Sequence, residues 1–153
     1  MTMLPAGTVA PLQRRAVAYV IDALIANAIV FVASLVYVGV WAATGRDLTA
    51  LTIGSAIIAV IALGWLMVYT AMQAGTGSIG MRAQRVRLVS ATTGAPLGFA
   101  TALLRNVIWA LGAAVVVGYF SVLFDSSGRF QGWHDKVARS LMIDDRSPSA
   151  EAH

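Results

Sequence analysis

The sequence predicts an all-α integral membrane protein with three hydrophobic segments. Of its 153 residues, 58% are hydrophobic and 12% are charged, whereas charged residues make up about 25% of an ordinary soluble domain. The apolar residues also fall into three long runs, and a helix needs about 20 apolar residues to cross a bilayer. A soluble fold of this size has too little interior to bury so much apolar surface.

The first hydrophobic segment predicts a helix over residues 17–43. The leader before it, residues 1–13, is rich in turn formers and should be flexible. Arg14 and Arg15 follow the leader, and basic residues hold the adjacent end of a span in the cytoplasm. A cleaved secretory signal is the alternative, but its apolar core has about 7 to 15 residues. This run is longer and contains Asp22.

The second hydrophobic segment predicts a helix over residues 51–72, which holds no charged residue. Between the first two helices, residues 44–50 form a short polar turn that should face the outside. Trp65 and Tyr69 lie near the inner end of the second helix, where aromatic side chains favour the membrane interface.

Residues 73–98 form a polar, basic loop that should lie in the cytoplasm. Polar and apolar residues alternate over 85–89, as in a half-buried strand. Residues 93–96 are rich in turn formers, and 97–99 have the composition of a second short strand. The loop is therefore predicted to contain a small β-hairpin at the membrane surface.

The third hydrophobic segment covers residues 99–124 and is interrupted by Arg105 and Asn106. Small residues recur every four positions within it, which is typical of a helix face that packs closely against another helix. The members of this predicted packing face are Ala110, Ala114 and Gly118.

Two topologies are open for the third segment. A single crossing would put Arg129, Lys136 and Arg139 outside, against the positive-inside tendency. A re-entrant hairpin that bends near Gly112 or Gly118 would instead return the tail to the cytoplasm.

Asp22 is the most unusual residue of the first segment, because an uncompensated carboxylate within a bilayer is costly. Arg15 precedes it by seven residues, two helical turns, and so shares its face about 10 Å away along the axis. Arg105 and Lys136 are the candidate cross-helix bases, and Arg105 is the better one because it also starts an apolar segment. The acid then forms either a structural ion pair or an ion or proton site.

Several other patterns predict no catalytic, cofactor or metal site. The glycines of 75–80 match a dinucleotide fingerprint, but they follow a membrane helix and no acid occurs before Asp125. His134 adjoins Asp135, yet neighbouring residues do not face each other in a helix or strand. The chain has no cysteine and only two histidines, His134 and His153, and the basic residues do not form the aromatic-interleaved stripe of a nucleic-acid binder.

Three separated pieces together resemble the RDD family of small bacterial membrane proteins. The stretch from Arg15 to Asp22 (RAVAYVID) is similar to the family's R-x-x-A-x-x-I-D helix start. A second piece runs from Gly75 to Arg105. The third, QGWHDKVARS at 131–140, resembles the closing H-D-K/R-x-A-G-T segment, with Arg139-Ser140 in place of Gly-Thr.

The resemblance covers residues 14–143, and the remaining residues, 144–153, are predicted to be a disordered polar tail. It implies that Asp135 is the second acid and that its segment packs back at the cytoplasmic side. We therefore expect a multi-pass protein of the plasma membrane with a transport or ion-coupling role. The charged residues nominated for that role are Arg15, Asp22, Arg105, Asp135 and Lys136.

The alternative is a non-catalytic accessory or scaffold subunit in which these charges are structural. Three helices enclose little volume, so we also expect a homo-oligomer or a larger membrane partner. No cofactor, metal or nucleic acid is expected to bind.

Overall fold

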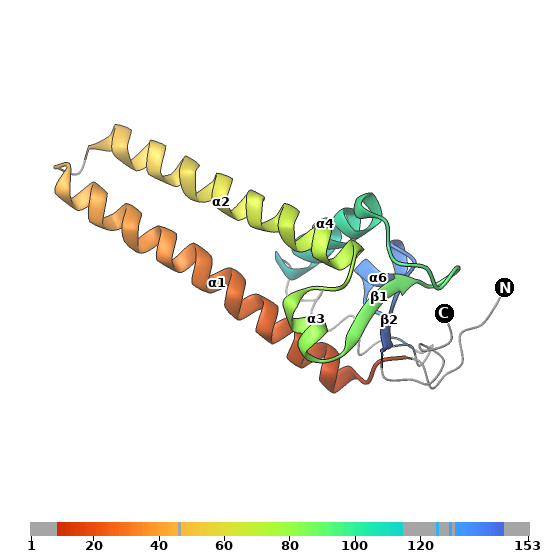
Figure 1. The fold of residues 1–153 in the computed structure, drawn as a ribbon. Coiled ribbons are helices and arrows are strands. Elements are labelled where there is room, and N and C mark those ends of the chain that lie inside the picture. Colours follow the sequence, from red (N-terminus) through yellow and green to blue (C-terminus); the bar gives the residue numbers. More distant parts are fainter. Residues whose placement is uncertain (1–8, 46, 115–124, 126–128, 130, 146–153) are drawn as a thin grey trace.

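The computed structural model describes residues 9–45, 47–114, 125, 129 and 131–145 (Figure 1). Their elements follow one another in the order α1 (Leu12–Ala43), α2 (Leu48–Ala74), α3 (Ile79–Ala83), β1 (Val86–Ser90), α4 (Phe99–Ala114), α6 (Trp133–Val137) and β2 (Ser140–Asp144).

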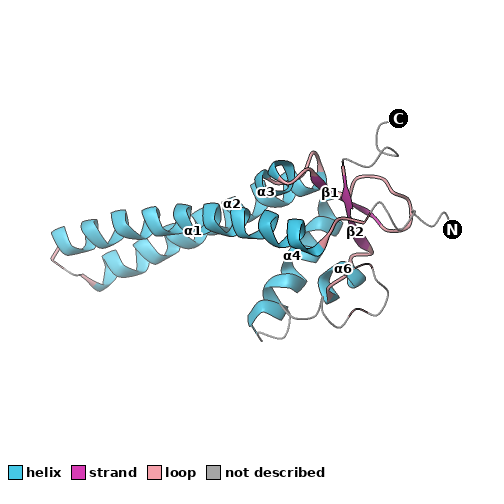
Figure 2. Ribbon diagram, turned by 90° about the horizontal axis from the view of Figure 1, so that it is seen from below, coloured by secondary structure: helices cyan, strands magenta, loops and turns pink. Residues whose placement is uncertain are grey.

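Helices α1 and α2 form a long hairpin that projects away from the other elements (Figures 1 and 2). Both predicted helices are confirmed. Helix α1 begins five residues before its predicted start and ends where predicted, and α2 extends beyond its prediction by three residues at its start and two at its end. The last part of the predicted flexible leader is instead ordered. Val9 forms a β-bridge with Ile143, the Ala10 amide donates to the Met142 carbonyl at 2.9 Å, and α1 begins at Leu12.

The hairpin carries its apolar side chains on the outside. Leu24, Val36 and Val60 are 66%, 64% and 67% exposed. Among the described residues, two helical stretches are long and apolar enough to cross a bilayer, Leu12–Ala43 and Leu48–Ala83, and their most apolar windows contain no buried residue. A contiguous apolar surface of this extent needs an apolar surrounding, which identifies a bilayer as the environment of the hairpin.

A two-stranded antiparallel sheet lies at the base of the hairpin, with Leu88 of β1 opposite Met142 of β2. The first strand is confirmed, but its predicted partner at 97–99 is wrong, because Phe99 already begins α4. Pro96 forms only an isolated bridge with Val89 among the described residues, since proline has no amide to continue a ladder. The strand from the C-terminal segment covers β1 instead and buries Leu88 and Met142 in the core.

The sheet joins two similar units. In each, a five-residue helix is followed by an arginine in the left-handed region and then a five-residue strand: α3, Arg85 (φ 52°) and β1, then α6, Arg139 (φ 47°) and β2. Arg85 and Arg139 are 54 residues apart, as are the paired Leu88 and Met142. A local two-fold axis therefore passes between Leu88 and Met142.

The third hydrophobic segment begins with α4, which packs against α2 and α6. Residues 115–124, including Gly118 of the predicted packing face, lie outside the described residues. Ala110 is exposed, and the packing face as a whole stays a prediction. Helix α6 and strand β2 lie beside β1, at the base of the hairpin (Figure 1). A single crossing would have carried them to the opposite end, so the fold agrees with the re-entrant alternative.

Candidate functional site

Asp22 is buried in the first turns of α1 and is bound by neutral donors. Its carboxylate accepts hydrogen bonds from the Ser78 hydroxyl at 2.5 Å, the Gly80 amide at 2.7 Å and the Tyr69 hydroxyl at 3.5 Å. Ser78 is also the N-cap of α3 and accepts from the Met81 amide. Asp22 therefore binds the start of α3 to α1, and its predicted pairing with Arg105 is wrong.

Gly80 makes this docking possible. A Cβ at Gly80 would overlap the Ala18 carbonyl of α1 and come within 3.0 Å of the Asp22 Cγ. The backbone of α3 can thus approach α1 closely enough to donate to the carboxylate only where a side chain is absent. Gly80, part of the dinucleotide-like pattern at 75–80, therefore serves close packing of α3 against α1.

Asp135 of α6 is the centre of a separate ion cluster and is only 1% exposed. Its carboxylate accepts from Arg105 Nε of α4 at 2.7 Å and from an Arg15 Nη of α1 at 3.3 Å. The Ser140 hydroxyl of β2 donates to it at 2.8 Å. Arg15 also donates to the Arg129 carbonyl at 3.1 Å. One acid thereby ties together three helices and the sheet.

The charges around Asp135 determine its protonation. Burial alone would raise the pKa of this carboxyl, but the positive charges of Arg105 and Arg15 outweigh burial and lower the pKa to about 2. The acid is therefore ionised at every physiological pH, as expected for a carboxylate with close cationic partners.

His134 lies against the same carboxylate, with Nε2 3.4 Å from Asp135 Oδ2. The expectation that these neighbours would not face each other is wrong, because α6 has five residues and both side chains turn into the same buried space. Burial lowers the pKa of His134 to about 4, and Arg105 and Arg15 add to this effect against the attraction of Asp135. His134 is neutral near pH 7.

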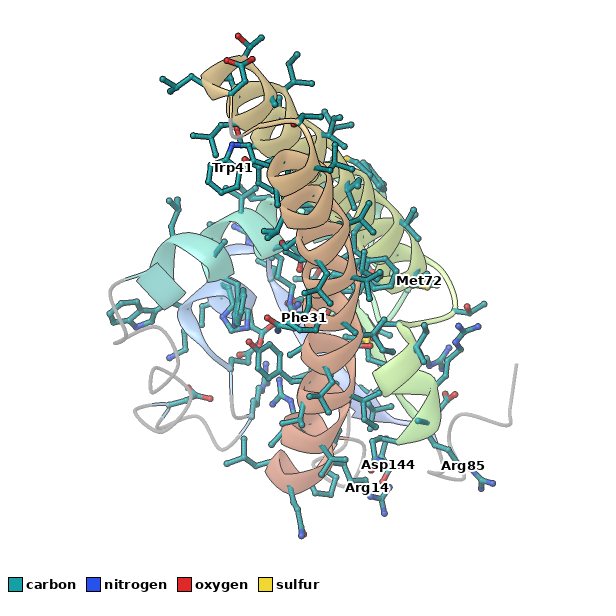
Figure 3. The ribbon with its side chains drawn as sticks, turned by 90° about the vertical axis from the view of Figure 1, so that its left-hand side faces the viewer. Arg14, Phe31, Trp41, Met72, Arg85 and Asp144 are labelled. Atoms are coloured by element: carbon teal, nitrogen blue, oxygen red, sulfur yellow. The ribbon has the colours of Figure 1, made fainter. Side chains whose placement is uncertain are left out.

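Lys136 lies outside the ion cluster. Its Nζ is 3.0 Å from Asp125 Oδ1, and its side chain is 46% exposed. A further pair joins Arg14 to Asp144 at 2.8 Å, and Figure 3 shows both residues together at the foot of α1, with Trp41 near the opposite end of the hairpin. Of the predicted charged residues, the structure thus brings together Arg15, Arg105 and Asp135. Asp22 has neutral donors instead, and Lys136 pairs with Asp125.

A cavity of about 710 Å³ lies between α1, α2 and α4, with part of α6 at its base. Its polar lining includes residues of both acidic sites: Arg15, Asp22, Gln73, Arg105, His134 and Asp135. Its walls are apolar and aromatic, with the Tyr19 and Trp109 rings 5.2 Å apart between centroids. The volume lies in the range of about 300 to 1,000 Å³ that small-molecule sites occupy.

Sequence reasoning missed three residues of these sites: Ser78, Ser140 and Gln73. Ser78 precedes a short helix and could have been found as an N-cap, the position where serine is favoured. Gln73 follows Trp65 and Tyr69 at four-residue steps, which places all three on one face of α2. Ser140 gave no signal, because its hydroxyl reaches Asp135 through the turn after α6.

These features define a helical integral membrane protein with an exposed apolar hairpin, two buried carboxylates at its base and a cavity between its helices. The family model described as RDD family matches residues 9–139, and the chain belongs to that family. No curated protein and no solved structure matches it.

Proposed function

We propose that this protein is a multi-pass transporter or ion-coupling protein of the plasma membrane, with Asp22 as the carboxylate that binds the transported cation or proton. One observation carries the proposal: the cavity of about 710 Å³ between the helices reaches Asp22. An acid within a span has either a structural or a transport role, and the cavity supplies the access that transport requires.

The two acids have different roles in this proposal. Asp135 is surrounded by two guanidinium groups and a hydroxyl, so a cation would meet strong repulsion there. Asp22 has neutral partners among the described residues, and its charge stays available to a cation. Asp22 therefore binds the ion, while Asp135 holds α1, α4 and α6 in place around the cavity.

The base of the hairpin faces the cytoplasm in this proposal. Support comes from its charge, because the exposed arginines that follow α2 and α6 lie there: Arg82, Arg85 and Arg139. Basic residues near spans favour the cytoplasmic side. The N-terminal end of α1 then lies inside and the turn near Thr44 lies outside.

Ion flux into proteoliposomes tests the role of Asp22. Vesicles that contain the purified protein and a pH-sensitive dye are given a NaCl or KCl gradient across the membrane. We expect an internal pH change that Asp22→Asn reduces at least tenfold, because the amide cannot exchange a proton or neutralise a cation. Asp47→Asn at the other end of the hairpin is the matched control and should leave the flux unchanged. Equal flux from the Asp22→Asn protein would refute the assignment.

The accessory-subunit alternative is favoured by the Asp135 cluster, in which a buried carboxylate accepts from two arginines and a serine, as in a structural ion pair. It predicts no flux from the purified protein under any gradient. It also predicts that gentle detergent extraction from the native membrane recovers the chain as a homo-oligomer or in a larger complex, which Arg105→Gln would dissociate.

A further inference from the structure

We infer that the cavity binds a small zwitterion with an apolar body, whose ammonium group lies against Asp22 and whose anionic group lies against Arg105. This inference rests on the proposed function and names the substrate class of the same cavity. The recognition chemistry is shared by a free apolar amino acid and by the headgroup of a zwitterionic phospholipid.

The charges of the cavity favour a dipolar organic ligand over an organic ion. The charged residues that line it are Arg15, Asp22, Arg105 and Asp135, which sum to zero, and His134 is neutral near pH 7 because burial lowers its pKa to about 4. An organic ligand with a net charge would fill the cavity and leave one buried charge uncompensated at considerable cost. A zwitterion adds no net charge and can match the separated charges of the lining.

Two of the charged residues that line the cavity can form further interactions with a ligand. Asp22 accepts from two hydroxyls and an amide, and none of these carries a positive charge. Arg105 donates to Asp135 through Nε, which leaves its terminal nitrogens without a hydrogen bond among the described residues. One wall of the cavity therefore offers an unpaired carboxylate charge, and another offers guanidinium donors.

Gln73 is the independent indication that a polar ligand belongs here. Its side chain is 1% exposed and lines the cavity beside the Tyr69 hydroxyl, its polar neighbour. Neither its amide nitrogen nor its amide oxygen makes a hydrogen bond of normal geometry with a described residue. Buried amides without partners are rare and destabilising. Because this amide offers both a donor and an acceptor, it can bond to the ammonium group and to the anionic group of one zwitterion.

The remaining lining accommodates an apolar body. Trp65, Leu66 and Trp109 line the cavity with Tyr19, and aromatic faces also attract ammonium groups. The lining continues along α1 from Asp22 to Val30, eight residues or about 12 Å of helix. A ligand with its charged groups at Asp22 and Arg105 can thus extend its apolar part between α1 and α2.

Binding to the detergent-solubilised full chain tests the ligand class. Tryptophan fluorescence would report binding, since Trp65 and Trp109 line the cavity. The probes are leucine, leucinamide, which lacks the anionic group, and 4-methylpentanoate, which lacks the ammonium group. We expect leucine to bind at least tenfold more tightly than either analogue. Equal binding of all three, or of an analogue above leucine, would overturn the inference.

A lipid arm separates the two sources of the zwitterion. Protein extracted from vesicles of phosphatidylethanolamine and phosphatidylglycerol in equal parts would be examined by native mass spectrometry. Preferential retention of phosphatidylethanolamine, with weak leucine binding, identifies a lipid headgroup as the occupant and supports the ligand class. Leucine binding without lipid preference identifies a free solute. If the protein shows no leucine binding and also no lipid preference, the inference is overturned.

Gln73→Met tests the site without removing a charge. Methionine removes the unpaired buried amide, so we expect an unchanged or higher unfolding temperature together with at least tenfold weaker binding of the preferred probe. Gln84→Met at the end of α3, away from the cavity lining, is the matched control and should leave binding unchanged. Undiminished binding by the Gln73→Met protein would count against the site. Zwitterion binding without flux would refute transport alone, and cation flux without zwitterion binding would refute the ligand class alone.

Discussion

Asp22 and Asp135 are both buried acids at the base of the hairpin, but they are stabilised by different chemistry. Asp22 is held by hydroxyl and amide donors, and Asp135 by two arginines and a serine. The sequence predicted Arg105 as the partner of Asp22, because both residues interrupt apolar runs. Arg105 pairs with Asp135 instead, since α6 folds back against α4 and brings an acid closer.

His134 and Asp135 should make the protein sensitive to acid in two steps. The pKa of His134 is lowered from 6.5 to about 4. Between pH 6.5 and 4, this histidine is therefore protonated in the unfolded chain and neutral in the folded chain. The contribution of neutral His134 to the free energy of unfolding is therefore fully present above pH 6.5, and the free energy of unfolding falls by roughly 3 kcal/mol as the pH drops to 4. A second loss follows between pH 3.8 and about 2, where Asp135 titrates.

Thermal unfolding in detergent at a series of pH values measures this effect. We expect His134→Gln to flatten the decline between pH 6.5 and 4, because the titrating group is gone, and to leave the loss below pH 4 in place. Parallel curves for the wild-type and His134→Gln proteins would show that the histidine does not carry the first step.

Among the elements, the turns that precede β1 and β2 each hold an arginine in the left-handed region, Arg85 and Arg139. This conformation costs free energy in any residue other than glycine. Arg139 occupies the position where the RDD pattern has glycine, and its φ of 47° is one that glycine adopts without strain. The next residue, Ser140, replaces threonine and still donates its hydroxyl to Asp135. The two replacements thus preserve both the turn before β2 and the hydroxyl that donates to Asp135.

Arg139→Gly should stabilise the protein by about 1 kcal/mol, because a left-handed conformation costs a non-glycine residue roughly that much. The unfolding temperature in detergent measures the gain. Arg82→Gly, within α3, is the matched control and should destabilise by about 1 kcal/mol, since glycine is unfavourable inside a helix. A loss of stability in Arg139→Gly would mean that the arginine side chain has a structural role.

Helix α3 has its place because Gly80 lacks a side chain. Gly80→Ala should lower the free energy of unfolding by about 2 kcal/mol or more, as overpacking typically costs 1 to 3 kcal/mol, although alanine favours helix. The overlap with the Ala18 carbonyl would push α3 off Asp22. Gly64→Ala has open space around it and should be neutral or stabilising. Equal unfolding temperatures for the two variants would contradict the close docking.

At the scale of the whole molecule, the sheet places the C-terminal segment at the same end as the start of α1 and the end of α2 (Figure 2). Two consequences follow from this pairing. Helix α6 and strand β2, which follow the third hydrophobic segment, lie at the base of the hairpin, and the two helix–turn–strand units face each other across a local two-fold axis between Leu88 and Met142.

Cysteine labelling tests the arrangement, since the chain contains no cysteine of its own. Arg85→Cys and Arg139→Cys lie at exposed, equivalent turns, and we expect a membrane-impermeant maleimide to label both from the same side in oriented vesicles. Asp47→Cys at the opposite end should react from the other side. Arg139→Cys reacting together with Asp47→Cys would place the C-terminal segment across the membrane.

Local sequence was enough to predict the membrane class, the two long helices, a strand at 85–89 that the structure has at Val86–Ser90, and the presence of buried charges at one end. These features depend on local composition and period, which neighbouring residues specify. Only the tertiary structure shows that Ser140–Asp144 is the partner strand, that Asp22 binds the start of α3 and that Arg105 pairs with Asp135. Contacts of this kind form only when a distant segment of the chain folds back against the site. The hydropathy pattern does not indicate which donor that segment will place nearest to each acid.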